Sequence, residues 1–185
     1  MNAKKYDAVL NLTDQIRLAS DRARSVTTVD TYPVDILSIF KGLGGTIYFK
    51  KEGEDGVGRY HSILKTTKPN EFEVLMLSPD AAKHMENRFL IARCLGYLFL
   101  HTEYVRGGDP ETLKVDPTTM FSPLDVDVFA ASILMPKDHF LEVASKNMIG
   151  SKYNMEIMSN YFQVPVERVR VYGIQLGTYR WRKDF

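Results

Sequence analysis

Apolar residues recur every three or four positions along most of the chain, which predicts a largely helical protein. Helices are expected at residues 5–23, 33–42, 124–134, 137–144, 151–161 and 166–176, and from a cap at Ser78 to about residue 104. Runs rich in β-branched and aromatic residues predict short strands at 46–49, 59–64 and 71–77. Because only short polar turns separate these runs, we expect an α+β fold with a small three-stranded antiparallel sheet.

The segment 87–101, NRFLIARCLGYLFLH, is apolar almost all the way round and is predicted to be a buried central helix. It carries Arg93 and Tyr97 four residues apart, so a guanidinium and a phenol share one of its faces. Residues 105–123, with two glycines and three prolines, are predicted to form a long loop.

Composition narrows the class of protein. Of the 185 residues, 44% are hydrophobic and 25% charged, which is enough apolar material for a globular core. The formal net charge of +1 gives no bulk electrostatic reason to expect nucleic-acid binding. The single cysteine, Cys94, excludes an internal disulfide framework and a cysteine-rich zinc site. No apolar run is long enough for a membrane span or a leader, so we expect a cytoplasmic protein with no membrane partner.

Two of the predicted helices carry a family resemblance. RFLIARCLGYLFLH and DVDVFAASILMP resemble RFTLAHELGHYLLH and EANRFAAELLMP, the two site helices of the ImmA/IrrE family of zinc metallopeptidases. Weaker likeness in PVDILSIFKGLGGTIYF, FEVLMLSPD and YFQVPVERVRVYGIQLG extends the resemblance over residues 32–177.

The resemblance implies a zincin-like two-helix core with additional C-terminal helices. It implies three regions: an N-terminal helix and linker at 1–31, a degenerate metallopeptidase-like domain at 32–150 and a C-terminal helical segment at 151–185. Family members are associated with phages and mobile elements and cleave transcriptional repressors. The resemblance therefore also implies a protein partner, and a helical DNA-binding repressor is the expected kind.

The residues that carry the family's chemistry are replaced in this chain. The His-Glu-x-x-His motif needs two imidazoles for zinc and a glutamate as general base, but those positions hold Arg93, Cys94 and Tyr97. The family's third ligand, a glutamate, falls on Asp125. An arginine keeps its proton in proteins and cannot ligate a cation, and a tyrosine near its ordinary pKa is a poor zinc ligand. We expect no bound zinc, no other cofactor and no catalytic residues.

Arg93 carries a positive charge where the family holds a metal cation. We expect its guanidinium to stand in for zinc and to pair with Asp125 or Asp127 on the second helix, because a buried arginine needs a counter-charge. The hydroxyl of Tyr97 is expected in the same network. The function that follows is that of a catalytically inactive anti-repressor or other regulator, acting by protein–protein binding.

Two alternatives remain open on sequence grounds. One is an active peptidase with a rebuilt site, built on Cys94 as a nucleophile or on a metal bound by His61, His84 or His101. The other is a structural or assembly module. The segment FQVPVERVR also has the pattern of a helix-turn-helix, but the chain lacks the basic stripe that DNA binding requires, so direct nucleic-acid binding is not expected.

Overall fold

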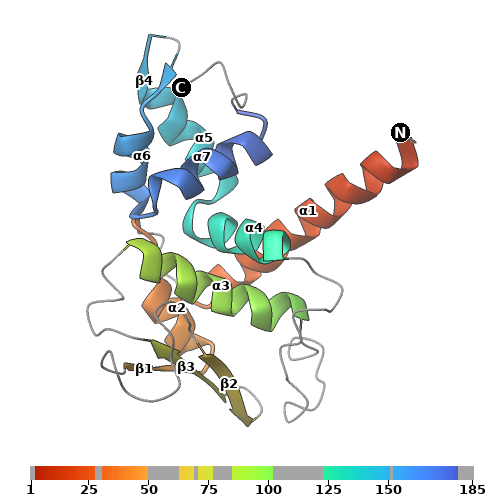
Figure 1. Cartoon of the computed structure of the whole chain (residues 1–185), viewed down its shortest axis with the longest axis vertical. Coiled ribbons are helices and arrows are strands. Elements are labelled where there is room, and N and C mark those ends of the chain that lie inside the picture. Colours follow the sequence, from red (N-terminus) through yellow and green to blue (C-terminus); the bar gives the residue numbers. More distant parts are fainter. Residues whose placement is uncertain are drawn as a thin grey trace.

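The computed structural model describes residues 3–27, 31–49, 63–68, 71–76, 85–101, 123–150 and 152–178. Their elements, shown in Figure 1, are α1 (Ala3–Arg24), α2 (Ile36–Gly42), β1 (Gly45–Phe49), β2 (Ile63–Lys68), β3 (Glu71–Met76), α3 (Met85–His101), α4 (Pro123–Leu134), α5 (Lys137–Lys146), β4 (Met148–Ile149), β5 (Lys152–Tyr153), α6 (Met155–Phe162) and α7 (Val166–Gln175). The mixed but helix-rich composition expected from the sequence is confirmed for this part of the chain.

Helix α3 lies in the middle of the molecule. The small sheet and α2 lie on one side of it and α4 on the other, while α5, α6 and α7 form the far end of the structure (Figure 1). Helix α3 packs most extensively against α4, and α4 also packs extensively against α1. The predicted burial of the central helix is confirmed, because Phe89, Ile91, Leu95 and Leu98 are all almost completely enclosed.

The sheet is mixed, so the expectation of an antiparallel sheet is wrong in one pairing. Its strand order is β1-β3-β2; β2 runs antiparallel to β3, but β1 runs parallel to it, with Gly45 opposite Phe72. At the start of β1 the rings of Phe40 and Phe72 meet edge to face, 4.7 Å apart, above Gly45. A Cβ atom on Gly45 would come within 2.3 Å of the Phe40 ring, so only glycine fits here.

Several element bounds differ from those predicted. Strand β2 continues to Lys68, through residues expected to form a turn, and α2 begins at Ile36 behind an Asp35 N-cap rather than at Pro33. Residues 152–153, expected at the start of a helix, instead pair with β4 in a two-stranded hairpin. The predicted Ser78 cap, the strand residues 59–62 and the loop at 105–122 lie outside the described residues.

Gly96 allows α3 and α4 to pack closely. A Cβ atom at this position would lie 3.1 Å from Val126 Cγ1, 3.2 Å from Phe129 Cδ1 and 3.3 Å from the Val126 carbonyl oxygen. These distances are shorter than ordinary van der Waals contacts, so a larger residue would push the two helices apart. Gly96 therefore fixes the spacing between the two helices that carry the family resemblance.

Arg88 joins three parts of the fold from the first turns of α3. Its side chain is 9% exposed, and it donates Nη2 to the Val34 carbonyl at 2.7 Å and Nε to the Gln163 carbonyl at 3.2 Å. Burial lowers the pKa of Arg88, and the nearby charge of Asp35 partly opposes that shift. The side chain thus donates hydrogen bonds to two backbone carbonyls outside the helices, one just before α2 and one just after α6.

Candidate functional site

Arg93 on α3 faces Asp127 on α4. Nε of Arg93 lies 2.8 Å from Oδ1 of Asp127, which is well within ion-pair distance. The contact is an ion pair without a well-formed hydrogen bond between these two atoms. Asp127 is one of the two carboxylates expected from the sequence to pair with Arg93.

A second arginine completes the cluster from α7. Arg168 donates Nη1 to Oδ2 of Asp127 at 2.8 Å, so the two carboxylate oxygens face two different guanidinium groups. The guanidinium carbon of Arg168 also lies 4.7 Å from the centre of the Phe89 ring, a cation–π arrangement. Side-chain exposure is 26% for Arg93, 22% for Asp127 and 35% for Arg168, so the cluster is partly shielded from water. One carboxylate thus links three helices.

The other degenerate family positions lie nearby on the same two helices. Cys94 is a core residue with 3% exposure, a setting in which a thiol behaves as a small apolar side chain. Tyr97 follows Arg93 by one helical turn and is half-buried. Asp125 is half-buried in the first turn of α4, where a carboxylate interacts favourably with the helix dipole. Participation of Tyr97 and Asp125 in the Arg93 network stays a prediction.

The described part of the chain offers no alternative metal centre. Among its residues, no group of three or more histidine, cysteine, aspartate or glutamate side chains lies close enough together to hold a metal ion. His61 and His84 fall outside the described residues, and His101 is described only as the last residue of α3. The rebuilt metal site considered from the sequence is therefore not tested.

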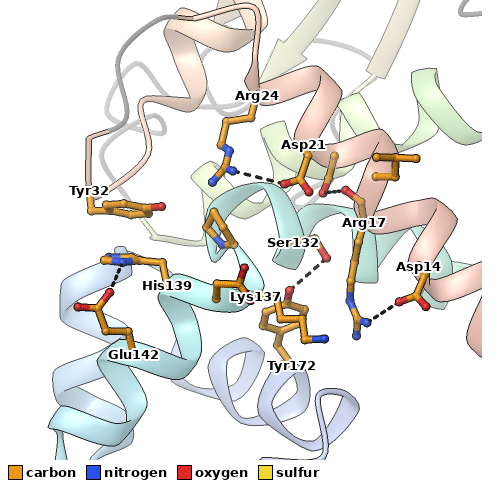
Figure 2. A pocket seen from close by; sticks show the side chains of 14 residues that line it. Asp14, Arg17, Asp21, Arg24, Tyr32, Ser132, Lys137, His139, Glu142 and Tyr172 are labelled. Carbon is orange, nitrogen blue, oxygen red and sulfur yellow. Dashed lines mark hydrogen bonds and ion pairs between the residues drawn. The ribbon is translucent and has the colours of Figure 1, made fainter.

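An open cleft of about 630 Å³ lies between α1 and α5, away from the Arg93 cluster. Figure 2 shows Arg17 and Arg24 extending from α1 toward α5 and α7, with Ser132 and Tyr172 between them. The Tyr172 hydroxyl donates to Ser132 Oγ at 3.3 Å. Burial raises the pKa of Tyr172, so its phenol stays protonated at neutral pH. This cleft is therefore lined mainly by polar side chains and is separate from the site implied by the resemblance.

An aromatic cluster borders this cleft. The His139 ring stacks on Tyr32 with 3.8 Å between ring centres, and its Nε2 lies 2.9 Å from the Tyr161 hydroxyl. His139 Nδ1 lies 3.4 Å from a Glu142 carboxylate oxygen. The cluster anchors the segment before α2 to helices α5 and α6, and so closes one end of the cleft.

Sequence reasoning missed Arg168, Phe89 and the whole cleft. Arg168 is one of several basic residues in the last third of the chain, and no periodicity marks it as the partner of Asp127. Phe89, one helical turn before Arg93, was available as a neighbour on the same face. The cleft is lined by α1, α4, α5 and α7, so no single segment of sequence carries its signature.

No protein-family model matches the chain, and no curated protein matches it. No helix within the described residues is both long and apolar enough to cross a membrane. The resemblance to the zinc metallopeptidases thus depends on the two helix motifs and on the physical argument made from them.

Proposed function

We propose that this chain is a non-catalytic relative of the ImmA/IrrE metallopeptidases that acts by binding another protein. The observation that carries the proposal is the ion pair between Arg93 on α3 and Asp127 on α4, 2.8 Å apart. The two helices are those whose motifs resemble the family's metal-site helices, and the pair spans them. A fixed cation on one helix and a carboxylate on the other keep the electrostatic link that a metal would supply.

The chemistry of the replaced residues supports the lack of catalysis. An activated water needs a metal that lowers its pKa to about 7, and neither a guanidinium nor a phenol in its ordinary state replaces an imidazole ligand. Cys94 occupies the general-base position but is buried, whereas a nucleophilic cysteine needs access to substrate and a base that forms its thiolate. These features favour binding over a rebuilt peptidase.

The spacing of α3 and α4 supports retention of a zincin-like two-helix core. Gly96 keeps the two helices close, and the Asp127 cluster links both of them to α7. A scaffold that keeps this core could bind a protein partner without cleaving it. We propose a helical DNA-binding repressor, or another regulator of a phage or mobile element, as the partner, and the cytoplasm as the place of action.

The proposal is tested with tag-free protein and the purified repressor encoded beside its gene. Size-exclusion chromatography with mass spectrometry should show a complex in which both chains are intact, and elemental analysis should show substoichiometric zinc. Repeating the experiment after incubation with zinc should leave the repressor uncut.

The matched variant is Arg93→Met, which removes the charge and keeps much of the side-chain length. It should bind no more zinc than the wild type and should also fail to cleave. If the wild type cleaves the repressor and this variant does not, the proposal is overturned in favour of the rebuilt peptidase. Absence of any complex with the repressor would overturn the choice of partner.

A further inference from the structure

Strand β1 is an edge of the three-stranded sheet. The strand order is β1-β3-β2, so within the described residues β1 pairs with β3 on one side and with no strand on the other. Figure 1 shows the sheet at the end of the molecule opposite α5, α6 and α7. An edge strand carries a row of backbone N–H and C=O groups that can pair with another extended chain.

The pairing with β3 determines which residues of β1 face the outer edge. The N–H of Phe72 donates to the carbonyl of Gly44 at 3.4 Å, and in a parallel ladder alternate residues of a strand bond to the same neighbour. Tyr48 therefore bonds to β3, whereas Ile47 and Phe49 present their N–H and C=O groups to the outer edge. The side chains beside these groups are accessible, since Tyr48 is 49% and Phe49 40% exposed.

The two edges of the sheet differ in how they are protected against pairing with another chain. Natural edge strands are commonly protected by lysine, proline or a β-bulge. Strand β2 carries Lys65 and Lys68, and its register with β3 shifts between Thr66 and Lys68. Strand β1, GTIYF, contains no charged residue and no proline, and its register with β3 is regular throughout. The sheet is thus protected at β2 and unprotected at β1.

We propose that β1 pairs with β1 of a second copy of the chain, antiparallel across a two-fold axis. In the proposed register Tyr48 lies beside its counterpart at the axis, and Ile47 of each copy lies opposite Phe49 of the other. Residues 47 and 49 both face the outer edge, so each such pair exchanges both N–H···O=C bonds. The two Tyr48 residues form the non-hydrogen-bonded pair, in which side chains lie closest and aromatic rings stabilise each other. The Tyr48 hydroxyl donates to Glu73 Oε1 at 3.4 Å, which holds the ring over the sheet.

The chemistry of the strand favours a second copy over a charged partner. Because β1 carries no charge, the strand brings no like charges together when it meets itself, and it offers no counter-charge to an acidic or basic segment. A two-fold contact uses the unprotected edge of both copies at once and closes the assembly. One short strand from each copy buries less area than a stable dimer needs, so the dissociation constant should be about 0.1–1 mM. This inference goes beyond the proposed function, since it involves neither Arg93 nor a repressor.

Analytical ultracentrifugation of the full-length protein tests the dimer. Between about 10 µM and about 1 mM, the fraction of dimer should rise with concentration. Phe49→Pro removes an outward N–H that β3 does not use and should weaken the dimer about tenfold, whereas Phe49→Ala keeps that N–H and should weaken it less. Tyr48→Lys places like charges opposite each other and should also weaken it about tenfold. Ile149→Lys is the control, because Ile149 is 67% exposed in the β4–β5 hairpin, outside the proposed contact, and it should dimerise like the wild type.

Cross-linking tests the register. In a non-hydrogen-bonded antiparallel pair the two Cα atoms are about 4.5 Å apart, a separation that a disulfide spans. Tyr48→Cys should therefore form a covalent dimer with oxidised glutathione about tenfold faster than Ile149→Cys, and the native Cys94, at 3% exposure, does not compete. Thermal unfolding checks that every variant folds. A monomer at every concentration, an equal loss of dimer in Ile149→Lys, or equal cross-linking rates in the two cysteine variants would overturn the proposal.

Discussion

Arg93 and Asp127 face each other across the contact between α3 and α4, with Nε and Oδ1 2.8 Å apart. Asp127 also accepts a hydrogen bond from Arg168, so the same carboxylate ties α7 to the pair. One turn further along α7, the hydroxyl of Tyr172 bonds Ser132 on α4. The helix that carries the shared carboxylate is thus fixed to α7 at two successive points, and to α3 at the first of them.

Asp127→Asn should destabilise the protein by removing the counter-charge of two arginines. The three side chains are partly exposed, so the cost lies between that of a surface pair and that of a buried one, about 1–2 kcal/mol. Urea unfolding monitored by circular dichroism measures the loss. Asp14→Asn, which breaks the exposed pair with Arg17, is the control and should cost less than about 0.5 kcal/mol. An equal loss of stability in the two variants would show that the shared carboxylate contributes no more to the free energy of unfolding than an exposed ion pair does.

The helices were predictable from sequence because the information that specifies them is local. The apolar residues of α3 and α4 follow a helical period or fill every face, and both helices were placed to within a few residues. The direction of β1 was not predictable in the same way. Gly45 and Phe72 pair although they are far apart in the sequence, so no short turn determines how their strands run. The β4–β5 hairpin was missed because each strand has only two residues, which is too short for any alternation to show.

The candidate site was predictable only in part for a similar reason. Arg93 stood out because a charge in an apolar helix requires a partner, and the next site helix offered two carboxylates. The sequence does not distinguish Arg168 in this way, because an arginine near the start of a helix is commonly a surface residue without a specific partner. Its distance from Asp127 depends on how α7 packs on α4, which is a tertiary property.

Gly96→Val should destabilise the protein because the new side chain enters the contact between α3 and α4. Its Cβ atom alone would meet Val126 and Phe129 at 3.1–3.2 Å, and the extra methyl groups make the overlap worse. Overpacking of this kind costs about 1–3 kcal/mol, more than valine's advantage over glycine in helix propensity. Differential scanning calorimetry measures the change.

Gly42→Ala is the matched control for that experiment. Gly42 is the last residue of α2, and a Cβ atom there would meet Val26 only at 3.4 Å, an ordinary contact. The substitution should be neutral or stabilising by up to about 1 kcal/mol, because alanine is the better helix former. If Gly96→Val were as well tolerated as Gly42→Ala, the inference that α3 and α4 leave no room for a side chain at position 96 would be wrong.

Arg88→Met should be among the more damaging single substitutions of a charged residue. It removes two charge-assisted hydrogen bonds and leaves the carbonyls of Val34 and Gln163 without this donor, at a cost of about 2–3 kcal/mol. Arg88→Lys keeps the charge but not the two-pronged geometry, so it should recover only part of the loss. Chemical denaturation of both variants measures these losses. Arg22→Met is the control, because Arg22 is exposed, and its stability should stay within about 0.5 kcal/mol of that of the wild type.

Tyr172→Phe should make the protein less sensitive to alkaline pH. Burial raises the pKa of Tyr172 in the folded state above its unfolded value of about 10, so the folded protein holds this proton more tightly. The resulting stability is fully present below pH 10 and is lost as the pH rises through the folded pKa, at up to about 1.4 kcal/mol per pH unit. Urea unfolding at pH 9, 10 and 11 should show a shallower decline in Tyr172→Phe than in the wild type.

Ser132→Ala distinguishes ionisation of the phenol from loss of its hydrogen bond. The variant lacks the acceptor of the 3.3 Å hydrogen bond but keeps the buried phenol, so it should lose about 1 kcal/mol or less at neutral pH. Because the bond to Ser132 lowers the pKa of Tyr172 and burial raises it, removing the bond should leave the alkaline decline as steep as before or steeper. An alkaline decline in Ser132→Ala as shallow as that of Tyr172→Phe would contradict the assignment of this pH dependence to the buried phenol.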